Sequence, residues 1–128
     1  MRALRDSRSL SVVARALITV VETAGFIASA AGLLTEEERV DVIEMLARDP
    51  ECGAVIPGTG GLRKVRIRVA GRGKSGGARV IYFFMNERTP IVALMVYAKN
   101  RTAQLTKAQE KELAAIASGV KKAKKEQT

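Results

Sequence analysis

Three short apolar runs between residues 62 and 97 constrain the fold more than any other feature of this sequence. The first, Leu62 to Val69, alternates between apolar and basic residues, as a half-buried strand does. The other two, Ala78 to Met85 and Ile91 to Tyr97, are too short and too rich in β-branched residues for helices. A Gly-rich basic turn (70–77) and a polar turn (86–90) join the three runs. The pattern predicts an antiparallel meander of three strands.

The residues before this meander predict a strand and two helices. Leu17 to Val21 is a short β-branched run, which favours a strand, and Gly25 to Leu34 has the spacing of a small apolar helix. Thr35 and Glu38 form a capping-box pattern, and Pro50 ends the helix that they open. Apolar residues at intervals of three predict the buried stripe of this second helix: Val40, Ile43 and Leu46.

A second capping-box pattern, at Thr106 and Gln109, opens a C-terminal helix that we expect to end at Gly119. The expected fold class is therefore α+β, with a small antiparallel sheet built from the meander and the N-terminal strand. A chain of 128 residues holds one such domain. Its expected organisation has three parts: a flexible leader (1–14), a single domain (15–120) and a basic tail that either extends the last helix or is disordered (121–128).

The positive charge is concentrated on the meander. The chain has 22 Lys and Arg against 13 Asp and Glu, a net charge of +9, yet no acidic residue lies between Glu51 and Glu87. Alternate strand residues face one way at intervals of about 6.6 Å, which suits the phosphates of a nucleic acid backbone. The pattern favours a polyanionic partner, although a solvated sheet face is the alternative. Seven cations lie in this interval: Arg63, Lys64, Arg66, Arg68, Arg72, Lys74 and Arg79.

Several classes of chemistry are excluded by residues that the chain lacks. It has no histidine, so mechanisms that need a histidine base are excluded, and a single thiol, Cys52, makes neither an internal disulfide nor a zinc site. Glu36, Glu37 and Glu38 open a helix, where capping and dipole compensation explain them. We therefore expect no metal and no cofactor.

Charge also argues against a membrane location. Arg15 and Glu22 leave only the residues from Ala16 to Val21 uncharged, which is short of the roughly 7–15 apolar residues of a signal peptide and of the about 20 of a membrane span. A single reduced thiol suits the cytosol. We expect a cytoplasmic protein that does not bind membranes.

Two further patterns need a decision. Gly71 to Gly76 matches G-x-G-x-x-G, but a strand follows it where a phosphate-binding loop needs a helix, so the match is rejected. Tyr97 closes the last strand and is followed by Lys99 and Arg101. On sequence alone, Tyr97 is either a residue at the core edge or part of a site, and the two cations are either solvated or functional.

Three segments of the sequence carry a family resemblance when they are taken in this order: Gly58–Arg66 (GTGGLRKVR), Gly76–Phe83 (GGARVIYF) and Tyr97–Asn100 (YAKN). Together they resemble the RelE/ParE superfamily of toxins, and most of all its HigB-like branch, over about residues 18–117. The resemblance implies a small antiparallel sheet with helices on one side and a concave side for RNA. It also implies a toxin that enters the ribosomal A site, among ribosomal RNA, and cleaves messenger RNA by attack of a ribose 2′-OH on the adjacent phosphate.

The resemblance further implies partners and residue roles. A cognate antitoxin, often a helix-turn-helix protein, neutralises such a toxin and carries it to operator DNA. Lys64 and Arg66 match the two basic residues of the family's first meander strand, and Arg79 matches the arginine that opens the next. Lys99 falls near the basic residue after the last strand, and Tyr97 joins this set as a catalytic candidate. The remaining cations are expected to bind RNA: Arg63, Arg68, Arg72, Lys74 and Arg101.

The identity of the general base stays open at this point. The family places a tyrosine in the C-terminal segment, where this chain has Leu105 or Thr106. Either Lys64, whose neutral form nearby cations would favour, or Tyr97 would have to serve. Arginines can stabilise the phosphorane-like transition state. Two alternatives use the same features without cleavage: a ParE-type inhibitor of DNA gyrase, and a basic protein that only binds nucleic acid.

Overall fold

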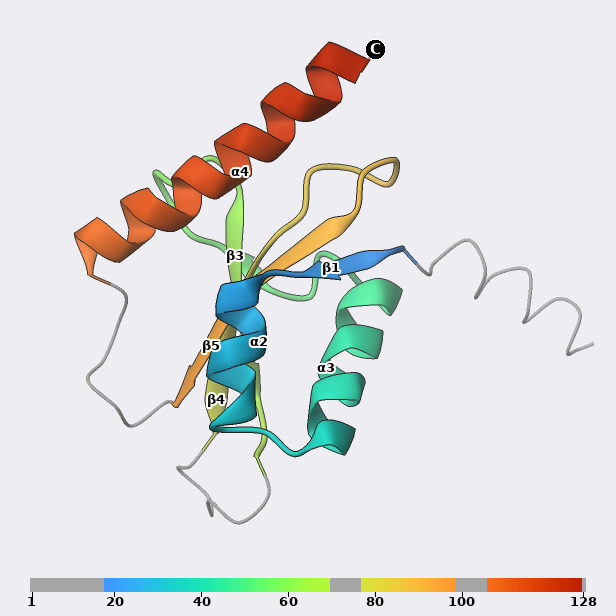
Figure 1. The fold of residues 1–128 in the computed structure, drawn as a ribbon, viewed down its shortest axis with the longest axis vertical. Coiled ribbons are helices and arrows are strands. Elements are labelled where there is room, and N and C mark those ends of the chain that lie inside the picture. The colour runs from blue at the N-terminus through green and yellow to red at the C-terminus, as the bar shows by residue number, and fades with distance from the viewer. Residues whose placement is uncertain (1–17, 70–76, 99–105, 128) are drawn as a thin grey trace, which may run out of the picture.

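The computed structural model of this chain describes residues 18–69, 77–98 and 106–127 (Figure 1). It has the expected α+β class, with two helices before the meander and one after it. The elements follow one another in the order β1 (Val20–Glu22), α2 (Ala24–Ala31), α3 (Glu36–Arg48), β2 (Ala54–Val55), β3 (Leu62–Ile67), β4 (Ala78–Phe83), β5 (Ile91–Ala98) and α4 (Lys107–Gln127).

The strands form one sheet in the order β1-β5-β4-β3-β2. Strands β3, β4 and β5 are antiparallel neighbours, which confirms the predicted meander. The expectation of a wholly antiparallel sheet was wrong, because β1 pairs with β5 in parallel, with Val20 opposite Ile91. β1 lies beside the last strand because the meander leaves that edge of β5 free. A short strand between α3 and β3, β2, also joins the sheet and pairs with the start of β3.

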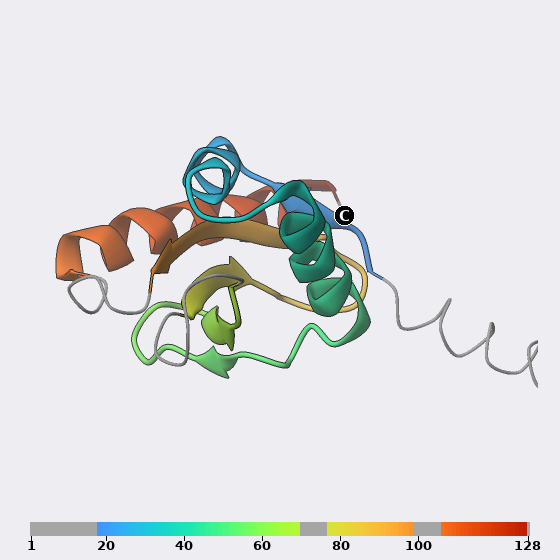
Figure 2. The same ribbon diagram turned by 90° about the horizontal axis from the view of Figure 1, so that it is seen from below.

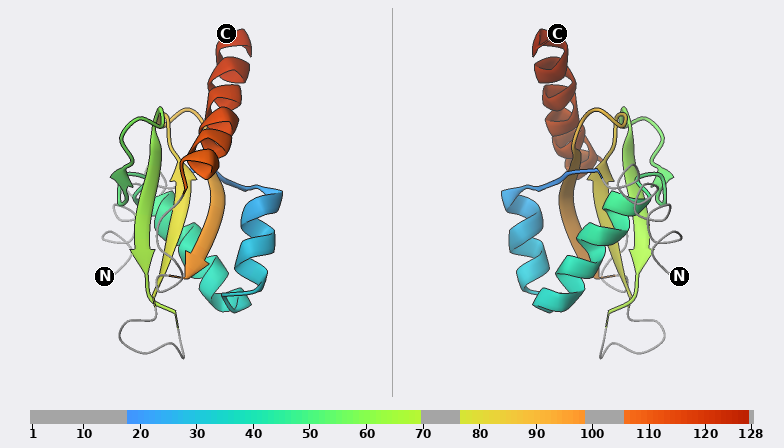
Figure 3. Two further views of the ribbon diagram at one scale, coloured as in Figure 1. Left: turned by 90° about the vertical axis from the view of Figure 1, so that its left-hand side faces the viewer. Right: turned by 90° about the vertical axis from the view of Figure 1, so that its right-hand side faces the viewer.

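Helices cover both faces of the sheet. Seen from below, α2 and α3 lie together on one side of the strands (Figure 2). The two views of Figure 3 show α3 in front of one face and α4 in front of the other. Each face has its own core. The core under α2 and α3 is centred on Phe26, Leu46 and Tyr82, and the core under α4 is centred on Leu62, Phe83 and Leu94.

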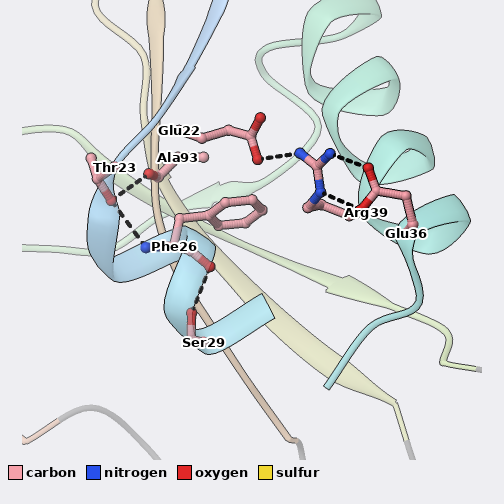
Figure 4. Close-up of polar contacts among 7 residues, drawn as sticks. All are labelled: Glu22, Thr23, Phe26, Ser29, Glu36, Arg39 and Ala93. Carbon is pink, nitrogen blue, oxygen red and sulfur yellow. Dashed lines mark hydrogen bonds and ion pairs between the residues drawn. The ribbon is translucent and has the colours of Figure 1, made fainter. Parts of the chain in front are cut away.

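Helix α3 begins as its sequence predicts and is tied to β1 by a charged side chain. The Thr35 hydroxyl accepts a hydrogen bond from the Glu38 N–H, and the Glu38 carboxylate accepts one from the Thr35 N–H, which completes the capping box. Arg39, one turn further on, binds the carboxylates of Glu22 and Glu36 (Figure 4). These two ion pairs fix the start of α3 beside the edge strand.

Helix α2 is attached to β5 through two hydroxyl groups. Thr23 caps the helix by accepting from the Phe26 N–H, and it donates to the carbonyl of Ala93 at 2.9 Å (Figure 4). Ser29 accepts a hydrogen bond from the Val96 N–H at 3.0 Å. Because β1 pairs only with Ile91 to Ala93, Ser29 serves a strand N–H further along the same edge.

One helix detail differs from the sequence predictions, and a second decides between two alternatives that the sequence left open. Val40 is exposed, and the buried residues of α3 are Val42, Leu46 and Ala47. Helix α3 carries two overlapping apolar stripes, and the one that contains Val42 faces the sheet. Helix α4 also continues past Gly119 to Gln127, so the basic tail extends the helix. A single glycine inside a helix costs about 1 kcal/mol relative to alanine, which is too little to end the helix by itself. Within the described ranges, no helix combines the length and apolarity that crossing a membrane requires.

Candidate nucleic-acid site

The predicted alternation of β3 places Lys64 and Arg66 on the face opposite to Val65 and Ile67. Val65 and Ile67 pack against the core under α2 and α3. Lys64 and Arg66 take the intervening positions, so their side chains project from the face that carries α4. Arg66 is exposed and Lys64 is half-buried. Lys64 and Arg66 are therefore available to a ligand on the α4 face.

Strand register brings Arg79 and Tyr97 beside Arg66. Arg66 is the direct partner of Arg79, and Arg79 is the direct partner of Tyr97. Directly opposed residues of neighbouring strands project from the same face and lie about 5 Å apart. Arg66, Arg79 and Tyr97 thus form a row across three strands, and Lys64 lies in the next row, opposite Ile81. Four of the five predicted catalytic residues share one part of one face.

Helix α4 lies beside this row, over the other half of the same face. The left view of Figure 3 shows α4 crossing the half of the face where β3 begins. There it packs through Ala117 against a core that contains Leu62 and Phe83. The row of Arg66, Arg79 and Tyr97 lies toward the opposite end, where β3 and β5 end and β4 begins. The face is divided into an apolar half under α4 and a cationic half.

The guanidinium of Arg79 has an unused donor. Its Nη1 atom is buried and has no hydrogen-bond partner among the described residues. A buried donor without a partner costs about 1–3 kcal/mol, so such groups are rare without a ligand or water. Arg79 also faces a second guanidinium, Arg66, on the neighbouring strand. A bound phosphate would neutralise this repulsion and accept from the free donor.

Tyr97 lies at the edge of the core and within the cationic row. Its ring packs against the apolar cluster under α4. Burial raises the pKa of Tyr97 above its ordinary value, and the positive charge of Arg79 opposes this only in part. The phenol is therefore protonated at neutral pH, and it can donate a hydrogen bond or a proton. This favours an acid over a base at position 97.

Two predicted RNA-binding residues, Arg63 in β3 and Arg68 just after it, occupy different surroundings. Arg68 is exposed and, with Arg66, lines a pocket of about 320 Å³ whose other wall includes Asp41 of α3. Arg63 belongs to the opposite face, where its guanidinium donates to the carbonyl of Gly53 at 2.7 Å. Arg63 is thus separate from the row. The other predicted site residues lie outside the described residues: Arg72, Lys74, Lys99 and Arg101.

Sequence reasoning did not identify Tyr82 as a residue that bears on this site. Tyr82 is fully buried, and its hydroxyl binds the segment between α3 and β2, next to Lys64. Burial raises its pKa, so the hydroxyl stays protonated. The signal was present, because a tyrosine within the apolar run from Val80 to Phe83 needs a hydrogen-bond partner for its hydroxyl.

The described residues bring together no group of three acidic or sulfur side chains that would hold a metal ion. Glu36 and Glu38 serve the start of α3, as the sequence indicates. The residues that this geometry assembles are cations and one phenol. Such a set can bind an anion, stabilise added negative charge on it and donate a proton.

Two comparisons with known proteins bear on this fold. Residues 50–128 match the sequence model of the family described as the RelE toxin of the RelE/RelB toxin-antitoxin system. Among solved structures, the chain is similar to a double mutant of the E. coli toxin RelE in the free state. The two are 15% identical, the match covers 80% of this chain and 97% of that chain, and the TM-score is 0.51. The structural match shows a shared fold, and the family match covers more than half of the chain.

Proposed function

This chain belongs to the RelE toxin family, and from that premise we propose that it cleaves messenger RNA in the A site of the ribosome. As a toxin of a toxin–antitoxin system, it has an antitoxin as its partner. The finer parts of the proposal are ribosome dependence, cleavage without a metal ion, action in the cytoplasm, and a helix-turn-helix antitoxin that alone contacts operator DNA. Membership of the HigB-like branch stays a prediction.

The observation that carries the proposal is the row of Arg66, Arg79 and Tyr97, with Lys64 beside it. Two arginines opposed across strands repel each other, and this arrangement is favourable when an anion lies between them. The free Nη1 donor of Arg79 supports the same conclusion. A phosphodiester offers oxygens at the spacing that two guanidinium groups require.

In the proposed reaction, the amine of Lys64 removes the proton of a ribose 2′-OH. The 2′ oxygen attacks the adjacent phosphorus, and Arg66 and Arg79 stabilise the added negative charge on the phosphoryl oxygens. The bond from phosphorus to the 5′ oxygen breaks, and this oxygen takes a proton from the Tyr97 hydroxyl. The products are a 2′,3′-cyclic phosphate and a 5′-OH end. Solvent then removes the proton from Lys64 and returns one to Tyr97.

The test is cleavage of messenger RNA by the purified protein in the presence of ribosomes. We expect cuts that end in a 2′,3′-cyclic phosphate, persist in EDTA and disappear when the 2′-OH at the cut site is replaced by hydrogen. Arg79→Ala and Lys64→Ala should each slow cleavage by about 10²–10³-fold. Arg88→Ala, which removes an exposed cation from the turn between β4 and β5, is the matched control and should cleave normally.

Three results would contradict the proposal. Undiminished cleavage by Lys64→Ala would remove Lys64 from the reaction. Intact messenger RNA together with inhibition of DNA supercoiling by gyrase would instead favour the ParE-type alternative. Binding of RNA with neither effect would favour a basic binding protein without catalysis.

A further inference from the structure

The segment that joins α3 to β2 is held by a hydroxyl group buried in the sheet. Tyr82 of β4 has no exposed surface. Its hydroxyl donates a hydrogen bond to the carbonyl of Pro50 at 2.6 Å and accepts one from the Gly53 N–H at 2.8 Å. The phenol thus fixes two points of this segment from the face opposite to the cationic row.

Arg63 holds the same segment from the neighbouring strand. It is the direct partner of Tyr82 across β3 and β4. Its Nη1 atom donates to the carbonyl of Gly53 at 2.7 Å, and its Nη2 atom lies 3.8 Å from the carboxylate of Glu51. Both backbone polar groups of Gly53 are therefore bound by side chains that stand next to each other on the sheet.

Gly53 in turn lies directly against the backbone of Lys64. A Cβ atom at position 53 would lie 2.9 Å from the Lys64 carbonyl oxygen and 2.9 Å from the Tyr82 ring. The next residue, Ala54, pairs with Lys64 in the sheet, and β2 contains only one further residue. A strand of two residues holds its neighbour weakly by itself. The bound Gly53 adds a restraint on this side of Lys64.

We propose that Tyr82 and Arg63 are positioning residues for Lys64, a role that rests on the proposed function. They touch no substrate. They fix Gly53, and Gly53 with Ile81 on the other side fixes the backbone from which the Lys64 side chain reaches the phosphate. A base must lie within hydrogen-bond reach of its proton, and a displacement of about 1 Å costs about 10²-fold in rate. Arg63 therefore serves the reaction from the face that RNA does not contact.

Tyr82→Phe, which removes one oxygen atom, tests this role. Thr89→Val is the matched control, because it also removes a buried hydroxyl that donates to a backbone carbonyl, in the turn between β4 and β5. We expect Tyr82→Phe to lower the cleavage rate at saturating ribosomes by about tenfold or more, with KM changed less than about twofold. Thr89→Val should lose about as much stability as Tyr82→Phe, yet cleave at the wild-type rate.

Arg63 supplies a second arm through its conservative variant. Arg63→Lys retains one donor for the Gly53 carbonyl and should keep most of the cleavage rate, whereas Arg63→Met should lose as much as Tyr82→Phe. If RNA contacted Arg63 directly, Arg63→Met would instead raise KM. A raised KM in Arg63→Met would overturn the inference. So would a wild-type rate for Tyr82→Phe, or an equal loss of rate in Thr89→Val.

Amide hydrogen exchange separates this inference from the proposed function. In the absence of RNA, the amides of Gly53 and Lys64 should exchange faster in Tyr82→Phe than in the wild type, and should be unchanged in Thr89→Val. A wild-type protein that cuts no RNA would refute the proposed function and, with it, a role in positioning a base. Unchanged exchange in Tyr82→Phe alongside normal cleavage by the wild type would overturn the positioning role alone.

Discussion

Replacing Arg79 with methionine should stabilise the protein while it slows cleavage strongly. Arg79 opposes Arg66 directly across β3 and β4, and its Nη1 donor is buried without a partner among the described residues. Methionine is similarly long and unbranched, so it can fill the same space without the charge. Arg79 is expected to contribute to ligand binding while it lowers the stability of the free protein.

The expected gain follows from two contributions. Like charges directly opposed on neighbouring strands are destabilising, by about 0.2–1 kcal/mol. An unsatisfied buried donor costs about 1–3 kcal/mol, part of which the side chain recovers by moving toward solvent. We expect Arg79→Met to raise the free energy of unfolding by about 1–2 kcal/mol, which for a domain of this size is a rise of about 4–8 °C in Tm. Cleavage should fall by about 10²–10³-fold.

Urea unfolding at neutral pH, at low and at high sodium chloride, is the assay. Added salt should stabilise the wild type more than Arg79→Met, because it screens the repulsion that the variant lacks. Arg88→Met, which removes one exposed cation from the same net charge of +9, is the control and should change stability by less than about 0.5 kcal/mol. If Arg79→Met is no more stable than the wild type, the row is not electrostatically strained and the reasoning is refuted.

Three further outcomes are expected. Thr35→Ala removes the capping box of α3 and should lower the free energy of unfolding by about 1 kcal/mol in urea unfolding, with unchanged cleavage. Gly77→Ala places a Cβ 2.6 Å from the carbonyl oxygen of Ile67; it should lower stability by about 2 kcal/mol, measured in the same way, because the backbone must shift. Burial raises the pKa of both Tyr82 and Tyr97 above 10.0, so their contribution to stability is complete below about pH 10 and is lost as pH rises further. Melting temperatures across this range should therefore fall at high pH, and less steeply in Tyr97→Phe.

Local signals predicted the elements that have local causes. The capping box at Thr35 and the one at Thr106 both form in the structure, because a hydroxyl and an acidic or amide side chain three residues later bind the first free N–H groups without tertiary help. Alternation predicted which β3 residues face the core. The sequence left two alternatives for the basic tail after Gly119, and the structure has the first of them, because α4 continues to Gln127.

Pairing over long distances had no comparable signal. The parallel contact of β1 with β5 joins residues about seventy positions apart, as Val20 and Ile91 show. Strand β2 is two residues long and has no pattern of its own. The binding of Gly53 by Tyr82 and Arg63 also depends on contacts between separate elements. These features follow from which surfaces meet after the meander forms.

The sequence by itself determined that Lys64 and Arg66 share one side of a strand, because side chains alternate with a period of two. It did not determine that Arg79 and Tyr97 join them. That depends on the register between β3, β4 and β5, with its irregularity at Ile81, and a slip of one residue would have placed Arg79 among the apolar side chains under α3. Burial of the two cores sets this register, so the tertiary structure alone decided that the cations meet.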